Sequence, residues 1–140
     1  MDSAGLAVLL GVLVLAAGAG LLLRARSGKL RVGGKAAGGW ALAGQTPTVG
    51  EHVLLLQLSS PVCAPCRQTA AVLDRLAADT PGLVHAELDV AEHPDAARLL
   101  NVMRTPTVVA FDRSGVELLR VSGVPRAAEL AAALAPALAR

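Results

Sequence analysis

A continuous run of 20 uncharged, mostly apolar residues at positions 4–23 is the strongest constraint on how this 140-residue chain folds. As a helix rising ~1.5 Å per residue, the run spans about the ~30 Å hydrocarbon core of a bilayer. Such a segment does not belong in a small globular core, so we predict a transmembrane anchor over residues 1–26. A secretory signal is the alternative, since small residues at 16–20 are typical of a cleavage region, although positions 1–3 lack positive charge.

Positive charge is concentrated directly after this apolar run. Five basic residues lie within residues 24–35, whereas residues 53–140 carry eight arginines against nine Asp and Glu residues. Basic residues at the C-terminal end of a first membrane helix favour a cytoplasmic location for the domain that follows. An extracytoplasmic location is the alternative. We expect no nucleic-acid binding, because no aromatic residues interleave the basic positions.

Residues 27–52 separate the predicted anchor from the regular part of the chain. The segment is rich in glycine, lysine and alanine, and the glycine pairs at 33–34 and 38–39 interrupt any periodicity. We therefore predict a mobile, basic, glycine-rich linker. Trp40, the only tryptophan, either docks onto the domain, lies at the lipid interface or stays partly exposed in the linker.

From residue 53 onward, the hydrophobic pattern becomes regular and predicts an α/β domain over residues 53–140. A continuous apolar run suits a central strand buried on both faces, alternation indicates further strands, and three- to four-residue spacing indicates helices. The expected strands lie at 53–58, 83–90, 107–112 and 116–121, and the expected helices at 66–78, at 94–100 and from 125 onward. The predicted order is βαβαββα.

The only two cysteines, Cys63 and Cys66, are separated by Ala64 and Pro65 where the first strand gives way to a helix. At this spacing they can close a disulfide across the first helical turn, and the helix N-terminus lowers the pKa of the outer thiol. This context predicts dithiol redox chemistry. A purely structural disulfide is disfavoured, because closing so short a loop gains little chain-entropy stabilisation. A metal site is also disfavoured, because there is no second cysteine pair to complete a set of four ligands.

Three separated features occur together in this chain: the C-x-x-C motif, Thr105-Pro106 immediately before the third strand, and a Ser-Gly pair at 122–123 after the last strand. In these features residues 53–140 resemble the thioredoxin family. The resemblance implies a thioredoxin-like three-layer sandwich, preceded here by a single transmembrane helix. It also implies a cis Thr105–Pro106 bond packed near Cys63, with the Thr105 backbone free to pair with an extended substrate.

By this resemblance, Cys63 is the nucleophile, Cys66 is the resolving thiol, and Ala64 and Pro65 tune the stability of the disulfide. No bound cofactor is implied, the substrates are protein disulfides or thiols, and a thioredoxin reductase or a membrane electron donor supplies electrons. The predicted function is a membrane-anchored thiol–disulfide oxidoreductase. The alternatives are a non-catalytic thioredoxin-fold interaction module at the membrane and an extracytoplasmic exchange protein.

Two positions depart from the family pattern. Gln57 stands where the family has a buried aspartate that moves the proton of the inner cysteine, and Val62 stands where it has tryptophan. His85, on the neighbouring strand where the family has lysine, is a candidate substitute proton carrier, because histidine titrates near neutral pH. We favour the alternative, a simple strand-face histidine. Glu87 and Asp89 are expected to be solvated strand-face charges.

Overall fold

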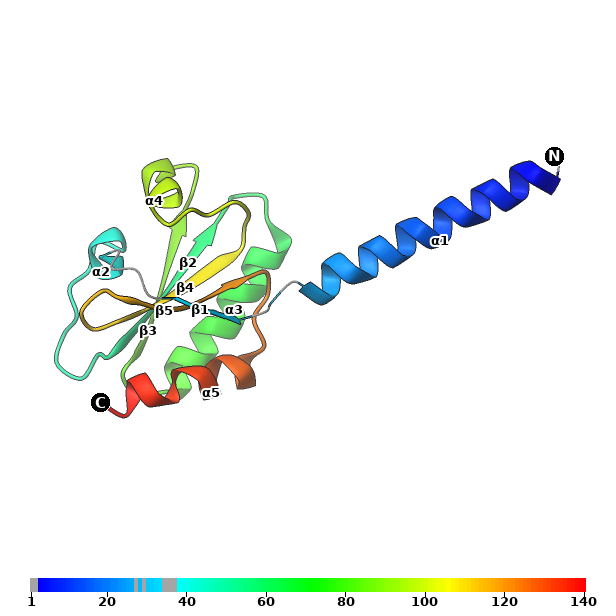
Figure 1. The fold of residues 1–140 in the computed structure, drawn as a ribbon. Helices are drawn as coiled ribbons and strands as arrows, with labels where there is room; N and C mark the ends of the chain where they lie inside the picture. The colour runs from blue at the N-terminus through cyan, green and yellow to red at the C-terminus, as the bar shows by residue number, and fades with distance from the viewer. Residues whose placement is uncertain (1–2, 27, 29, 34–37) are drawn as a thin grey trace.

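The computed structural model describes residues 3–26, 28, 30–33 and 38–140. A five-stranded mixed sheet in the order β1-β5-β4-β2-β3 forms the centre of the domain (Figure 1). From β2 to α5 the elements follow the predicted βαβαββα order. The strands are β1 (Leu30–Val32), β2 (Val53–Ser59), β3 (Leu83–Asp89), β4 (Thr107–Asp112) and β5 (Glu117–Ser122), and the helices are α1 (Ser3–Arg26), α2 (Gly39–Leu42), α3 (Ala64–Asp79), α4 (Pro94–Leu99) and α5 (Ala127–Leu138).

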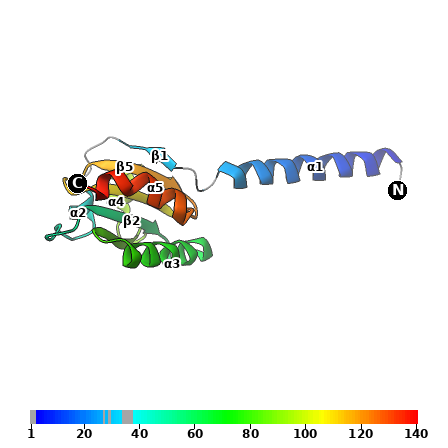
Figure 2. The ribbon, with the colours of Figure 1, turned by 90° about the horizontal axis from the view of Figure 1, so that it is seen from below.

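The central strand β2 is buried along its whole length because both faces of the sheet are covered. It pairs in parallel with β3 and antiparallel with β4. Val53 and Leu55 pack with residues of α3 and α5 on one face, whereas Leu54 and Leu56 pack with residues of α2 and α4 on the other. Figure 2 shows α3 and α5 side by side over the face of the sheet that is turned toward the viewer. A strand covered on both faces needs no polar side, which explains why β2 is apolar except at Gln57 and Ser59.

The interpretation of residues 27–52 as a linker is wrong for much of the segment that the structure describes. β1 extends the sheet by pairing antiparallel with β5. Trp40 is only 5 % exposed, lies in the same buried cluster as Phe111, and donates a hydrogen bond from Nε1 to the Asp112 carbonyl oxygen at 2.8 Å. A three-residue strand and one docked side chain produce no periodicity for sequence analysis to detect. Residues 27, 29 and 34–37 of the predicted linker lie outside the described residues.

The N-terminal helix α1 extends away from the domain (Figure 1). Its segment Gly5–Ala25 is long and apolar enough to cross a membrane, and none of its residues is buried in the described structure. Signal sequences share this length and composition. The helix is therefore a candidate membrane span.

Candidate redox site

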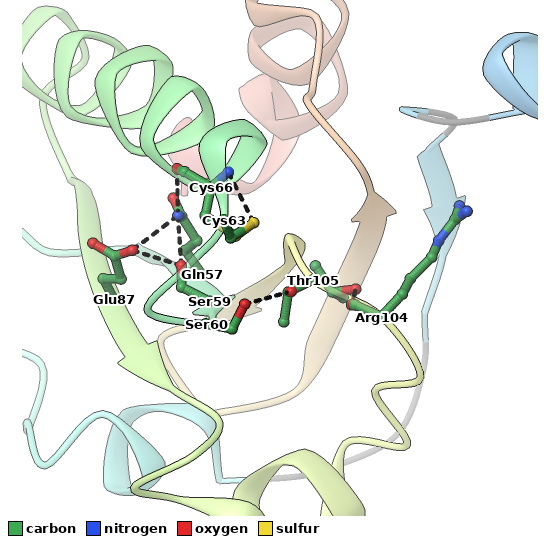
Figure 3. The surroundings of a disulfide bond; sticks show 9 residues. Gln57, Ser59, Ser60, Cys63, Cys66, Glu87, Arg104 and Thr105 are labelled. Carbon is green, nitrogen blue, oxygen red and sulfur yellow. Dashed lines mark hydrogen bonds between the residues drawn. A yellow bond between two sulfur atoms is a disulfide. The ribbon is translucent and has the colours of Figure 1, made fainter.

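Cys63 and Cys66 form a disulfide at the N-terminus of α3, with their Cα atoms 5.2 Å apart (Figure 3). Cys63 caps the helix, and its Sγ accepts a hydrogen bond from the Cys66 backbone N–H at 3.2 Å. Cys66 is 2 % exposed, whereas Cys63 is half-buried. Cys63 is thus the more exposed residue of the pair, in the order of exposure that the sequence predicts.

The Thr105–Pro106 peptide bond is cis, as the family resemblance implies. It directly precedes β4, whose first residue Thr107 pairs with Leu58 near the end of β2. The hydroxyl groups of Ser60 and Thr105 lie 3.1 Å apart. This contact links the loop before the cysteines to the loop before β4, so the sheet brings the two predicted site segments together.

A buried polar network lies beneath Cys66 (Figure 3). The fully buried Gln57 side chain donates from Nε2 to the Cys66 carbonyl oxygen at 2.9 Å, to Ser59 Oγ at 2.8 Å and to Glu87 Oε1 at 3.2 Å. Ser59 Oγ donates to the same Glu87 oxygen at 2.5 Å. The amide of Gln57 therefore connects the backbone of the inner cysteine to a carboxylate on the neighbouring strand.

The structure does not bring His85 to the cysteines. In the β2–β3 register His85 pairs with Leu55, and its Nδ1 lies 2.7 Å from an oxygen of Asp74 on α3. The residue opposite Gln57 is Glu87. Glu87 is exposed, as expected of a solvated strand-face charge, and its carboxylate in addition accepts hydrogen bonds from Gln57 and Ser59. Sequence alternation identified the correct face of β3 but not which residue lies opposite Gln57.

A pocket of about 260 Å³ opens beside the disulfide. It places both cysteines and the Glu87 carboxylate around one solvent-accessible space. Its lining residues are Ser59, Ser60, Pro61, Cys63, Cys66, Arg67, Glu87 and Asp89. Ser59 is not among the site residues expected from the sequence, although a polar residue that ends an apolar strand just before the cysteines was a usable signal.

Comparison with known proteins identifies the family. The thioredoxin family model matches residues 47–136, which is more than half of the chain. The chain belongs to the thioredoxin family. It is a thiol–disulfide oxidoreductase of the thioredoxin type, with a C-x-x-C pair able to form a disulfide. The match begins after α1, β1 and α2, so those three elements lie outside the matched residues.

Individual thioredoxins show the extent of the similarity. The chain is 31 % identical over 78 residues to a thioredoxin of Echinococcus granulosus, covering 56 % of this chain and 72 % of that protein. It is 39 % identical over 64 residues to a thioredoxin of Staphylococcus aureus, covering 45 % of this chain and 62 % of that protein. A solved mutant thioredoxin from Halobacterium salinarum superposes with a TM-score of 0.58 at 26 % identity, covering 63 % of this chain and 76 % of that chain.

Proposed function

We propose that this thioredoxin-family chain reduces protein disulfides at a membrane, with Cys63 as nucleophile and Cys66 as resolving thiol. The supporting observation is the disulfide that joins a half-buried Cys63 to a buried Cys66 at the start of α3. The Cys63 thiolate attacks a substrate disulfide, and one substrate sulfur leaves as a thiolate. The Cys66 thiolate then attacks Cys63 Sγ, which closes the Cys63–Cys66 bond and releases the second substrate thiolate.

Each cycle transfers two electrons from the dithiol to the substrate, so an external donor must reduce the disulfide again. We assign that step to a thioredoxin reductase or a membrane electron donor. Ala64 and Pro65 tune the balance between dithiol and disulfide, since Pro65 lacks a backbone N–H and restricts the turn between the cysteines. No protein-bound cofactor takes part in this scheme.

The loop containing Thr105 and Pro106 is the proposed substrate-binding segment. An extended substrate pairs with the Thr105 backbone there, as in main-chain recognition at a sheet edge. Val62 and Met103, beside the two site loops in sequence, are 98 % and 87 % exposed. Exposed apolar side chains at these positions suit a polypeptide substrate.

Substrate trapping tests this mechanism. In the full-length chain in detergent, Cys66→Ala should capture substrates as mixed disulfides through Cys63, because the releasing attack is lost. The Cys63→Ala/Cys66→Ala double variant is the matched control. Recovery of the same adducts from that control would contradict the cysteine roles. Absence of insulin-disulfide reduction by the wild type would favour the non-catalytic interaction module.

The proposed anchor is α1, with the domain in the cytoplasm. Support comes from the length and apolar composition of Gly5–Ala25 and from the basic residues that follow it. Protease added to intact cells should leave the domain undigested, and a reporter fused after Arg140 should be active only in the cytoplasm. Digestion from outside would move the domain to the extracytoplasmic side, and a mature N-terminus near Gly20 would identify a cleaved signal.

A further inference from the structure

The chain enters the sheet at the same end as the redox site. The backbone N–H of Gly28 donates to the Ser122 carbonyl oxygen at 2.7 Å, and that of Gly123 donates to the Pro106 carbonyl oxygen at 2.8 Å. Ser122 also pairs with Thr107 in the β4–β5 register. The segment arriving from α1 therefore contacts β5 beside the loop that contains the cis proline.

The connection from α1 to this point is short. The helix ends at Arg26, and Gly28 already bonds to β5. At no more than ~3.6 Å per residue, those two steps reach about 7 Å. The opposite end of the sheet lies farther from α1 than the redox-site end does. The difference is the length of β2, whose seven residues extend about 23 Å at ~3.3 Å each.

We infer that the redox-site end of the sheet faces the bilayer and that the substrates are disulfides of integral membrane proteins close to the membrane surface. This inference rests on the proposed function, in which α1 spans the membrane. A tether attached at this end keeps the cysteines near the surface and turns the opposite end of the domain away. A substrate disulfide at the surface then meets the dithiol at a high effective concentration.

The charges at this end suit such an orientation. Arg31 and Arg104 are exposed and line a pocket of about 560 Å³ together with Arg120. Arg120 is paired with Glu117, whereas no ion pair of Arg31 or Arg104 occurs among the described residues. Figure 3 shows the Arg104 side chain pointing toward β1. Basic residues next to a membrane helix attract anionic headgroups with about 1 kcal/mol per side chain.

The test uses the full-length, pre-reduced chain in vesicles that contain a transmembrane peptide with an intramolecular disulfide. In one peptide the disulfide lies at the membrane surface. In the other it follows a helical spacer of about 27 residues, ~40 Å long. We expect the surface disulfide to be reduced about tenfold faster, since effective concentration falls sharply when a tether cannot span the distance. Equal rates for the two peptides would overturn the inference.

A matched variant inserts 20 Gly/Ser residues between Arg26 and Ser27, which adds a flexible span of about 25 Å. This variant should reduce both peptides at similar rates. Soluble insulin should be reduced equally by both proteins, which reports the proposed activity separately. Loss of insulin reduction by the wild type would refute the activity, and release of the wild type from the vesicles would refute the anchor. An unchanged preference for the surface peptide after insertion would show that the tether does not set the orientation.

The polar network beneath Cys66 supports a second inference independently. Glu87 is an exposed residue, yet one of its oxygens accepts hydrogen bonds from Gln57 and Ser59. The same residue lines the pocket beside Cys66. The other charged residues facing that pocket are Arg67 on α3 and Asp89 on β3. The carboxylate of Glu87 thus belongs both to the buried network at the inner cysteine and to solvent.

We propose that Glu87 accepts the proton of the Cys66 thiol during the resolving step of the proposed function. The S–H proton passes through the solvent-accessible pocket to the carboxylate as Cys66 sulfur attacks Cys63 sulfur. The protonated Glu87 then returns the proton to solvent or to the departing substrate thiolate. Gln57 is a positioning residue, because its amide holds the Cys66 carbonyl oxygen and Glu87 in one network.

Reduction of the symmetric disulfide of 5-thio-2-nitrobenzoate reports the reactions of the two cysteine thiols separately, because 5-thio-2-nitrobenzoate is released in two phases. Attack by Cys63 releases the first equivalent, and attack by Cys66 releases the second. At pH 7, Glu87→Gln should slow the second phase by about 100-fold, at the lower end of the range for a positioned base. The difference should shrink toward pH 9, since the free thiol then ionises without help.

The first phase in the same variant reports an intact fold and an intact Cys63. Glu129→Gln removes an exposed carboxylate on α5 and should leave both phases unchanged, whereas Glu87→Asp should recover part of the second phase. A slowing that is equal at every pH would show that Glu87 only supports the structure. A second phase unchanged by Glu87→Gln would also overturn the proposal, while a wild type with no second phase would refute the proposed function itself.

Discussion

The helix α1 and the strand β2 are both mostly apolar and rich in leucine, yet their surroundings are opposite. Every residue of β2 is buried, whereas the large apolar residues of α1 are between 48 % exposed at Leu6 and 75 % exposed at Leu15. The sequence that follows β2 supplies neighbouring strands and two layers of helices. None of the described residues covers α1. An apolar run therefore requires an apolar environment, but its neighbours determine whether the protein itself provides one.

The largest expected effect concerns α1. Leu9→Arg/Leu13→Arg should move the chain from the membrane fraction to the soluble fraction, because two arginines near the centre of a spanning helix cost about 5–7 kcal/mol of insertion free energy. Fractionation followed by insulin reduction measures both location and activity. Full retention in the membrane fraction would mean that α1 is not what holds the protein there.

A leucine truncation in each region compares the two environments directly. Leu56→Ala should lower the free energy of unfolding by about 2–5 kcal/mol, because it opens a cavity in a packed core. Leu13→Ala in α1 should change the unfolding of the domain by no more than about 0.5 kcal/mol. Denaturant titration of the full-length chain in detergent measures both values. Similar losses would show that α1 packs against the domain.

A smaller effect tests whether the segment before β2 belongs to the core. Trp40→Phe keeps most of the apolar contact but removes the hydrogen bond to the Asp112 carbonyl oxygen. The expected loss of stability is about 1 kcal/mol, measured by circular dichroism during urea unfolding. Val49→Ala, at an exposed position nearby, is the control and should be neutral. If Trp40→Phe left the free energy of unfolding unchanged, the segment before β2 would again be interpreted as a linker.

The smallest effect concerns the β4–β5 turn. Burial raises the pKa of Asp112, but hydrogen bonds from the Ser114 hydroxyl and from backbone N–H groups that include that of Val116 outweigh it, so the pKa is lowered overall. A lowered pKa in the folded state stabilises the domain above the ordinary value of about 3.9. That stabilisation is lost as the pH falls through the folded-state value. Asp112→Asn should therefore lower the melting temperature at pH 7 and have less effect below about pH 4. A difference from wild type that is the same at pH 7 and pH 3 would contradict this ionisation.

Much of the fold was predictable because its signals are local. The run of apolar residues at 53–56 in β2, the alternation of β3 and the helical spacing of α3 each arise from a few consecutive residues. The C-x-x-C motif at the start of a helix and Thr105-Pro106 before β4 are equally short patterns. They were sufficient to predict the thioredoxin-like order and the cysteine pair, because secondary structure depends largely on side-chain periodicity and turn chemistry.

The remaining features depend on contacts between residues far apart in the chain. Glu87, not His85, lies opposite Gln57 because the β2–β3 register is set by packing across 30 residues of sequence. The pairing of β1 with β5 and the docking of Trp40 likewise need partners about 70 to 90 residues away. Periodicity along one strand indicates which face a side chain occupies, but only packing of the whole sheet determines what that side chain meets.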